Sequence, residues 1–136
     1  ENQKLVAEGA GAVPVAAALF HKLPIEGKKV VCLVSGGNID VNILSRVITR
    51  GLVMSGRKAN LTIALEDKPG QLQRVAEIVS RCGSNVVSVL HDGSDPNMPI
   101  SSCFLKLTLE TRDNAQIEQI RQELTKAGFQ LVAERV

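Results

Sequence analysis

A short polar loop, Asp67-Lys68-Pro69-Gly70, contains residue types that could recognise a free amino acid. It joins an expected strand to an expected helix, where free backbone N–H groups and the positive end of the helix dipole favour a carboxylate. Gly70 lets a ligand approach the backbone closely, and Asp67 could pair with an ammonium group. Asn85, at the start of the next strand, adds a donor and an acceptor. The alternative is that Asp67 only caps the helix and Asn85 is a turn residue.

A second candidate site follows an apolar run nearer the N-terminus. Ser35-Gly36-Gly37-Asn38 comes directly after the run from Lys29 to Val34, in the position of a glycine-rich turn between a strand and a helix. Backbone N–H groups in such a turn can bind an anion. The same residues also suit a tight turn without a ligand, so this signal is weak by itself.

Two segments with different hydrophobic patterns must position these loops, and the polar residues 55 to 58 separate them. In the first segment, residues 1 to 56, Gly9 to Lys22 predicts an Ala-rich helix. The continuous apolar run from Lys29 to Val34 predicts a strand that is buried on both faces. Apolar residues at helical spacing from Asp40 to Leu52 predict a second helix. Because one strand cannot make a sheet, this segment is expected to be a helix-strand-helix remnant of an α/β unit.

The second segment, residues 57 to 136, contains enough elements to close on itself. Alternating apolar residues predict three strands, Asn85 to Leu90 is expected to be a further strand, helical spacing predicts two helices, and Asp113 with Gln116 predicts a capping box. The order βαββαβ is the ferredoxin-like arrangement, an α+β fold with both helices on one face of an antiparallel sheet. The expected strands are 61 to 65, 85 to 90, 103 to 109 and 129 to 133, and the expected inner helix stripes are Leu72, Val75, Ala76, Val79 and Cys82, then Ile117, Ile120, Leu124 and Ala127.

The composition argues against several classes of function. A net charge of +2, from 16 basic and 14 acidic residues spread along the chain, offers no face for nucleic acid or anionic lipid. The cysteines Cys32, Cys82 and Cys103 form no C-x-x-C pair, which predicts reduced core residues in a cytoplasmic protein. Neither His21 nor His91 has Cys, Asp or Glu at a spacing typical of a ligand cluster, so no metal site is predicted. No apolar stretch reaches the roughly 20 residues that span a bilayer.

The sequence from Leu65 to Leu72, Leu-Glu-Asp-Lys-Pro-Gly-Gln-Leu, followed by Gly83-Ser84-Asn85-Val86, resembles the ACT-domain pattern. The resemblance covers the whole second segment. It implies a regulatory domain that pairs with a second copy and binds an amino-acid effector where the two copies meet. Carried over to this sequence, it implies effector contacts from Asp67, Lys68, Pro69, Gly70, Gln71 and Leu72, with Asn85 and Val86 reaching from a partner subunit.

The first segment resembles the closing part of fold-type II pyridoxal-phosphate enzymes, specifically threonine and serine ammonia-lyases (dehydratases). The residues that carry the resemblance are Ala7 to Ala12, the apolar run, and Ser35 to Asp40. It implies that Ser35, with Gly36 beside it, contacts the pyridine nitrogen of the cofactor and that Glu8 lies near the same end of the ring. Glu8 could instead be only an acidic residue in the first turn of a helix. The Schiff-base lysine and the phosphate cradle lie upstream in that family, and no lysine of this chain can be assigned that role.

The leading hypothesis is therefore a C-terminal fragment of a fold-type II catalytic domain, residues 1 to 56, followed by an ACT regulatory domain, residues 57 to 136. The parent would be a pyridoxal-phosphate-dependent threonine ammonia-lyase of isoleucine biosynthesis, converting threonine to 2-oxobutanoate and ammonia. The chain starts at Glu1 rather than Met, which suggests a piece of a longer protein, and this piece should be inactive alone.

Isoleucine or valine is the expected allosteric effector, and the expected assembly is a homodimer through the ACT domains. Two alternatives stay open. The second segment could be an ACT-type dimerisation module that binds no effector. It could also sense a nucleotide in a catabolic threonine or serine ammonia-lyase, although the single Lys68 in the loop offers little capacity to bind phosphate.

Overall fold

The computed structural model describes residues 5–96 and 98–132, and the chain divides into two compact units, Glu1–Val47 and Ile48–Val136. The first unit contains α1 (Gly9–Leu19), and α2 (Val41–Met54) runs from the first unit into the second. The sequence-based boundary near residues 55 to 58 lies just beyond the end of α2. None of the described helices is long and apolar enough to cross a membrane.

The first helix ends three residues before the predicted Lys22, and α2 begins where the sequence predicts it. The side chain of Asp40 accepts hydrogen bonds from the backbone N–H groups of Asn42 at 2.8 Å and Ile43 at 3.2 Å. These bonds satisfy donors that have no partner within the helix, which fixes the start of α2.

The strand predicted from Lys29 to Val34 is not formed, and this prediction was wrong. The run has no regular secondary structure, and Val31 is 97% exposed. A strand needs a neighbouring backbone to pair with, and the described part of the first unit contains no other strand. The thiol of Cys32 contacts the carbonyl oxygen of Pro14 at 3.7 Å, so the middle of the run touches α1.

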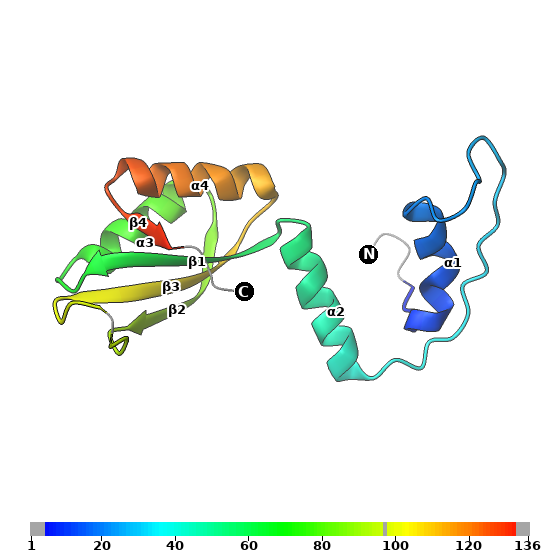
Figure 1. The fold of residues 1–136 in the computed structure, drawn as a ribbon, viewed down its shortest axis with the longest axis horizontal. Helices are drawn as coiled ribbons and strands as arrows, with labels where there is room; N and C mark the ends of the chain where they lie inside the picture. Colours follow the sequence, from blue (N-terminus) through cyan, green and yellow to red (C-terminus); the bar gives the residue numbers. More distant parts are fainter. Residues whose placement is uncertain (1–4, 97, 133–136) are drawn as a thin grey trace. The chain divides into compact units, whose positions relative to one another are not determined.

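The second unit forms the six elements that the sequence predicts, in the predicted order. Its four strands pair antiparallel in the order β2-β3-β1-β4, and both helices cover one face of the sheet (Figure 1). This arrangement is ferredoxin-like and confirms the predicted α+β fold class. Ala133 of the expected last strand lies outside the described residues. The elements are β1 (Lys58–Glu66), α3 (Gln71–Arg81), β2 (Asn85–Asp92), β3 (Ser102–Glu110), α4 (Asn114–Lys126) and β4 (Gln130–Val132).

The hydrophobic core lies between the sheet and the two helices. Alternation puts one apolar face of β1 and β3 against the helices, as predicted. The stripe of α3 differs from the prediction, because Ile78 is buried whereas Leu72 and Ala76 are exposed. Leu72 stands in the first turn, beyond the reach of the core. The buried core includes Leu61, Ile63, Val75, Ile78, Val79, Leu105, Leu107, Leu109, Ile120, Leu124 and Phe129.

The start of α4 confirms the predicted capping box in a modified form. The Asp113 side chain accepts a bond from the backbone N–H of Gln116 at 2.8 Å. The Gln116 side chain accepts one from the N–H of Arg112 at 2.7 Å, one residue earlier than the standard motif. Its amide nitrogen donates to the carbonyl oxygen of Cys82 at 2.8 Å, which ties the start of α4 to the end of α3.

Candidate functional site

The loop after β1 continues the sheet briefly and then turns into α3. The N–H of Asp67 still donates to the carbonyl oxygen of Ser101 at 2.8 Å. Gly70 then adopts φ +89°, a left-handed conformation that glycine reaches without strain, and serves as the N-cap of α3. No side chain caps this helix, so Asp67 is not a capping residue and its carboxylate is available for other contacts.

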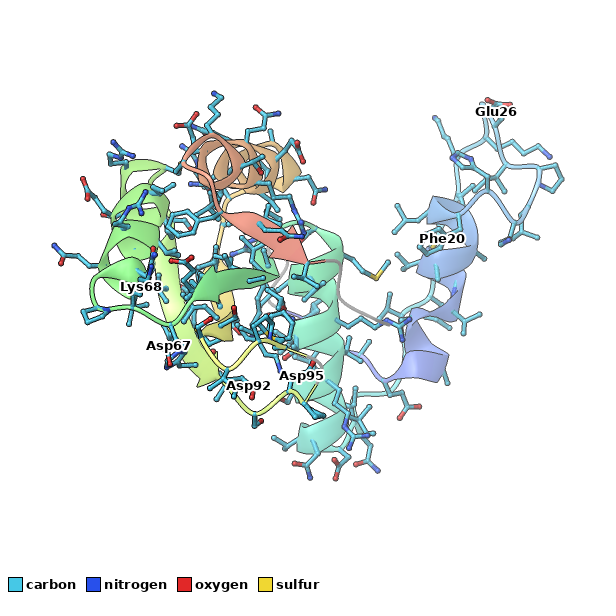
Figure 2. All side chains as sticks on the ribbon, turned by 60° about the vertical axis from the view of Figure 1, so that its left-hand side comes forward. Phe20, Glu26, Asp67, Lys68, Asp92 and Asp95 are labelled. Carbon is cyan, nitrogen blue, oxygen red and sulfur yellow. The ribbon has the colours of Figure 1, made fainter. Side chains whose placement is uncertain are left out.

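The loop encloses one side of a cavity of about 220 Å³, which we call the loop pocket. Figure 2 shows Asp67 and Lys68 on the loop that joins β1 to α3. Six of the eight predicted effector residues line this pocket, and three leucines form its apolar wall. Its lining is Leu65, Asp67, Lys68, Pro69, Gly70, Gln71, Leu72, His91 and Leu105.

His91 is a residue of the pocket that the sequence-based prediction missed. Its Nε2 lies 3.4 Å from Oδ1 of Asp67, and both side chains are about half exposed. His91 pairs with Leu105 in the sheet register and therefore faces the helix side of β2. Because β2 continues beyond Leu90, where the predicted strand ended, alternation could have placed His91 on the helix-facing side of the sheet, but it could not have placed His91 beside Asp67.

Cys103 lies beside this pair on the central strand β3 and is fully buried. Burial raises the pKa of its thiol, and the nearby Asp67 carboxylate raises it further. The residue is therefore a protonated thiol next to two polar side chains at one end of the core.

Gln71 offers an acceptor that no protein group uses. Its side-chain oxygen is buried and is without a hydrogen-bond partner within the described structure. Gln71 also lines a second, larger cavity of about 540 Å³, beside Arg74 and Phe129. That cavity is more open, and the guanidinium of Arg74 already stacks 5.2 Å from the ring centroid of Phe129. We regard the loop pocket as the better site because the loop donors, the carboxylate and the apolar walls converge there.

The charge of Lys68 is directed to its neighbour rather than free for a ligand. Its Nζ lies 2.6 Å from Oε2 of Glu66, and this hydrogen bond holds the pKa of the Glu66 carboxyl below its usual value. Both side chains are well exposed, so the pair contributes little to stability.

The other two predicted effector residues lie elsewhere within this chain. Asn85 is the first residue of β2, at the strand end away from His91, and its amide donates to Oε2 of Glu110 at 3.1 Å. Val86 pairs with Leu109 and packs against the core. Neither lines the loop pocket of its own chain, and a role from a partner subunit stays a prediction.

In the first unit, the three predicted cofactor contacts lie together. The N–H of Glu8 donates to the carbonyl oxygen of Gly36 at 3.1 Å. A Cβ atom placed at Gly36 would lie 2.6 Å from the Glu8 carboxylate, and one placed at Gly11 would lie 1.5 Å from the Ser35 carbonyl oxygen. Glu8 is the N-cap residue of α1, before its first turn, and makes no side-chain cap. This cluster joins a hydroxyl-bearing and a carboxylate-bearing residue, a set that fits one edge of a pyridine ring.

The second unit combines a ferredoxin-like sheet with a ligand-sized pocket at its first strand-to-helix loop, which is the arrangement that the resemblance to ACT domains predicts. No family model matches the chain. It is 47% identical to an L-threonine ammonia-lyase of Thermotoga maritima over 131 residues, which are 96% of this chain and 32% of that protein. It is 40% identical to an L-threonine ammonia-lyase of Geobacter sulfurreducens over 129 residues, 95% of this chain and 32% of that protein.

The chain thus spans about a third of the length of these two curated relatives, both of which are named L-threonine ammonia-lyase. A solved structure of the ACT domain from GTP pyrophosphokinase of Chlorobium tepidum is also similar to it. That match has a TM-score of 0.43 at 15% identity and covers 55% of this chain and 96% of that domain.

Proposed function

We propose that this chain is the regulatory end of a pyridoxal-phosphate-dependent threonine ammonia-lyase, and that its ACT domain binds a branched-chain amino acid in the loop pocket. The parent enzyme would convert threonine to 2-oxobutanoate and ammonia, and isoleucine or valine would be the effector. The similarity to threonine ammonia-lyases over nearly the whole chain supports the parent activity.

The unsatisfied oxygen of Gln71 is the observation that carries the effector proposal. A buried acceptor without a partner costs about 1–3 kcal/mol, and a ligand that donates a hydrogen bond removes this cost. An α-ammonium group donates three. Asp67 and Gln71 line the same pocket, and we propose that one such group meets both the charge of Asp67 and the empty acceptor of Gln71.

The rest of an amino acid also finds suitable partners in the pocket. The N–H groups in the first turn of α3 have no side-chain cap and suit a carboxylate. Leu65, Leu72 and Leu105 form an apolar wall for an aliphatic side chain. The volume of about 220 Å³ is below the roughly 300–1,000 Å³ of pockets for drug-sized ligands, which favours a molecule of amino-acid size.

Regulation would work through differential affinity. An effector that binds one subunit arrangement more tightly shifts the active and inactive populations by that difference. Among the described residues β2 pairs with β3 alone, which makes it an edge strand, and it carries exposed Val87, Val89 and Leu90. This edge suits pairing with a second copy, and Asn85 and Val86 of that copy would then contact the effector. The same feature also favours the second candidate function, a dimerisation module without an effector.

In the parent enzyme, pyridoxal phosphate supplies an electron sink for chemistry at the substrate's α-carbon. Within this chain, Ser35, Gly36 and Glu8 would hold the ring-nitrogen edge of the cofactor. The chain offers no lysine for the Schiff base, so we propose that it is inactive alone.

Titration calorimetry on the whole 136-residue chain tests the effector proposal. We expect heat of binding for isoleucine or valine and weaker binding for threonine and serine. Replacing Asp67 by Asn removes a charged partner of the ammonium group, which should weaken binding by roughly ten- to a hundred-fold. Glu77→Gln, which removes an exposed carboxylate on α3, is the matched control and should leave binding unchanged.

Sedimentation of the same samples separates the candidates. A sensor should lose its ligand response in Asp67→Asn while its oligomeric state stays that of the unchanged chain. A folded dimer that gives no heat with any of the four amino acids would leave only the dimerisation module. Heat with AMP or another nucleotide, and none with amino acids, would favour the nucleotide sensor instead.

A further inference from the structure

Three metal-ligating side chains that are far apart in the sequence meet at one end of the sheet. Their potential ligand atoms, a carboxylate oxygen of Asp67, a ring nitrogen of His91 and the sulfur of Cys103, all lie within 4.8 Å of one another. We propose that these residues bind a thiophilic divalent transition-metal ion, with Zn²⁺ as the best fit.

The strand register explains why the three side chains converge. Cys103 stands on β3, which lies between β2 and β1 in the sheet. Cys103 pairs with Leu65, and Asp67 lies two residues after Leu65. Leu105 lies two residues after Cys103 and pairs with His91. Side chains two apart on a strand share a face, so all three lie on the helix-facing side. The metal would therefore connect the loop to both neighbouring strands.

One of the three separations already suits a tetrahedral zinc ion, and the sulfur of Cys103, within 4.8 Å of the other two ligand atoms, would move closer on binding. With ordinary Zn–S, Zn–N and Zn–O bonds, ligand atoms of a tetrahedral site lie roughly 3.3–3.7 Å apart. The observed separation of 3.4 Å between His91 Nε2 and Asp67 Oδ1 already has this value. A thiolate, an imidazole and a carboxylate also form a ligand set that zinc accepts, with the fourth position left to water or another ligand.

The nearby lysines have partners of their own, so neither competes with a metal for Asp67, whereas the metal and the ammonium group of an effector would compete for this carboxylate. Lys68 pairs with Glu66, and Lys106 bonds to Asp92 at 2.9 Å. Lys106 alternates with Leu105 along β3 and so lies on the opposite face of the sheet. Metal binding is opposed by the buried thiol of Cys103, because the metal must displace its proton.

Cobalt(II) is the probe, because a cysteine thiolate bound to it gives a near-ultraviolet charge-transfer band together with visible bands of tetrahedral cobalt. The whole chain, kept reduced, is titrated with Co²⁺ and then with Zn²⁺. We expect one cobalt per chain and bleaching of the band by zinc. The chain has three cysteines, so the double variant Cys32→Ala/Cys82→Ala retains Cys103 alone and should keep the band.

Two variants complete the test. Cys103→Ala should abolish the band, whereas Cys82→Ala, which alters another buried cysteine away from His91, should not. His91→Ala changes a half-exposed side chain and should weaken cobalt binding at least about ten-fold in a folded protein. A folded double variant without the thiolate band would overturn the proposal, as would a band that persists in Cys103→Ala. Isoleucine binding is measured separately, so its failure would leave the cobalt result unaffected.

Discussion

Gln116 connects two helices through a side chain that is 2% exposed. Its amide donates to the carbonyl oxygen of Cys82 and accepts from the N–H of Arg112. Both partners sit at helix ends, where backbone groups lack intrahelical partners. Gln116 therefore provides partners for the Cys82 carbonyl and the Arg112 N–H, and these two bonds also satisfy its own side-chain amide.

Replacing Gln116 by Ala should lower the free energy of unfolding by about 1–3 kcal/mol, because it leaves the buried carbonyl of Cys82 and the partly buried N–H of Arg112 without this partner. The bond from the backbone of residue 116 to Asp113 survives the change. Urea unfolding followed by circular dichroism measures the effect. Gln122→Ala on the exposed side of the same helix is the control and should change stability by less than about 0.5 kcal/mol. Equal effects of the two variants would refute this role for Gln116.

The residues of the loop pocket show what sequence reasoning can reach at this scale. The contiguous residues Asp67 to Leu72 could be predicted together, because a strand-to-helix loop keeps neighbours in sequence close in space. His91 and Cys103 could not be predicted as their neighbours. Their approach depends on strand order and register, which alternation alone does not determine.

At the scale of the element, hydrophobic periodicity predicted β1, β3, α3 and α4 because each of them has one buried face. The strand predicted from the apolar run Lys29 to Val34 was wrong because this run has no such buried face. A fully apolar run is typical of a strand that is buried on both faces, but it does not show that the neighbouring strands and helices that bury it are present. In this chain those residues stay largely exposed, and no strand forms.

Two leucines on the helices allow the contribution of core packing to be compared with that of pocket lining. Leu124 of α4 is fully buried, so Leu124→Ala should cost about 2–5 kcal/mol in unfolding free energy. Leu72 of α3 is 49% exposed and lines the loop pocket, so Leu72→Ala should cost less than about 1 kcal/mol. Isoleucine should bind Leu72→Ala more weakly than the unchanged chain. Urea unfolding and calorimetry measure the two effects, and a large stability loss in Leu72→Ala would place this side chain in the core instead.

At the scale of the whole molecule, the apolar core belongs to one unit. The buried hydrophobic residues within the described ranges run from Ala59 to Phe129. In the described part of the first unit the buried residue is Gly11, packed against the Ser35 carbonyl, and Val30, Val31, Leu33 and Val34 of the run after α1 are exposed. Cooperative unfolding requires a core, so the second unit is the part expected to unfold as one.

The unit Ile48–Val136 should therefore fold when it is produced without the preceding residues. Its urea transition should have a midpoint and slope close to those of the whole chain, since the slope follows the surface exposed on unfolding. Hydrogen exchange of the whole chain gives an independent check. Sheet amides of β1 and β3 should be protected up to the global unfolding free energy, whereas residues 29 to 34 should exchange rapidly because no ladder protects them. Leu124→Ala should destabilise the shorter chain as much as the whole one, and a shorter chain that fails to fold would show that the core is incomplete without the first unit.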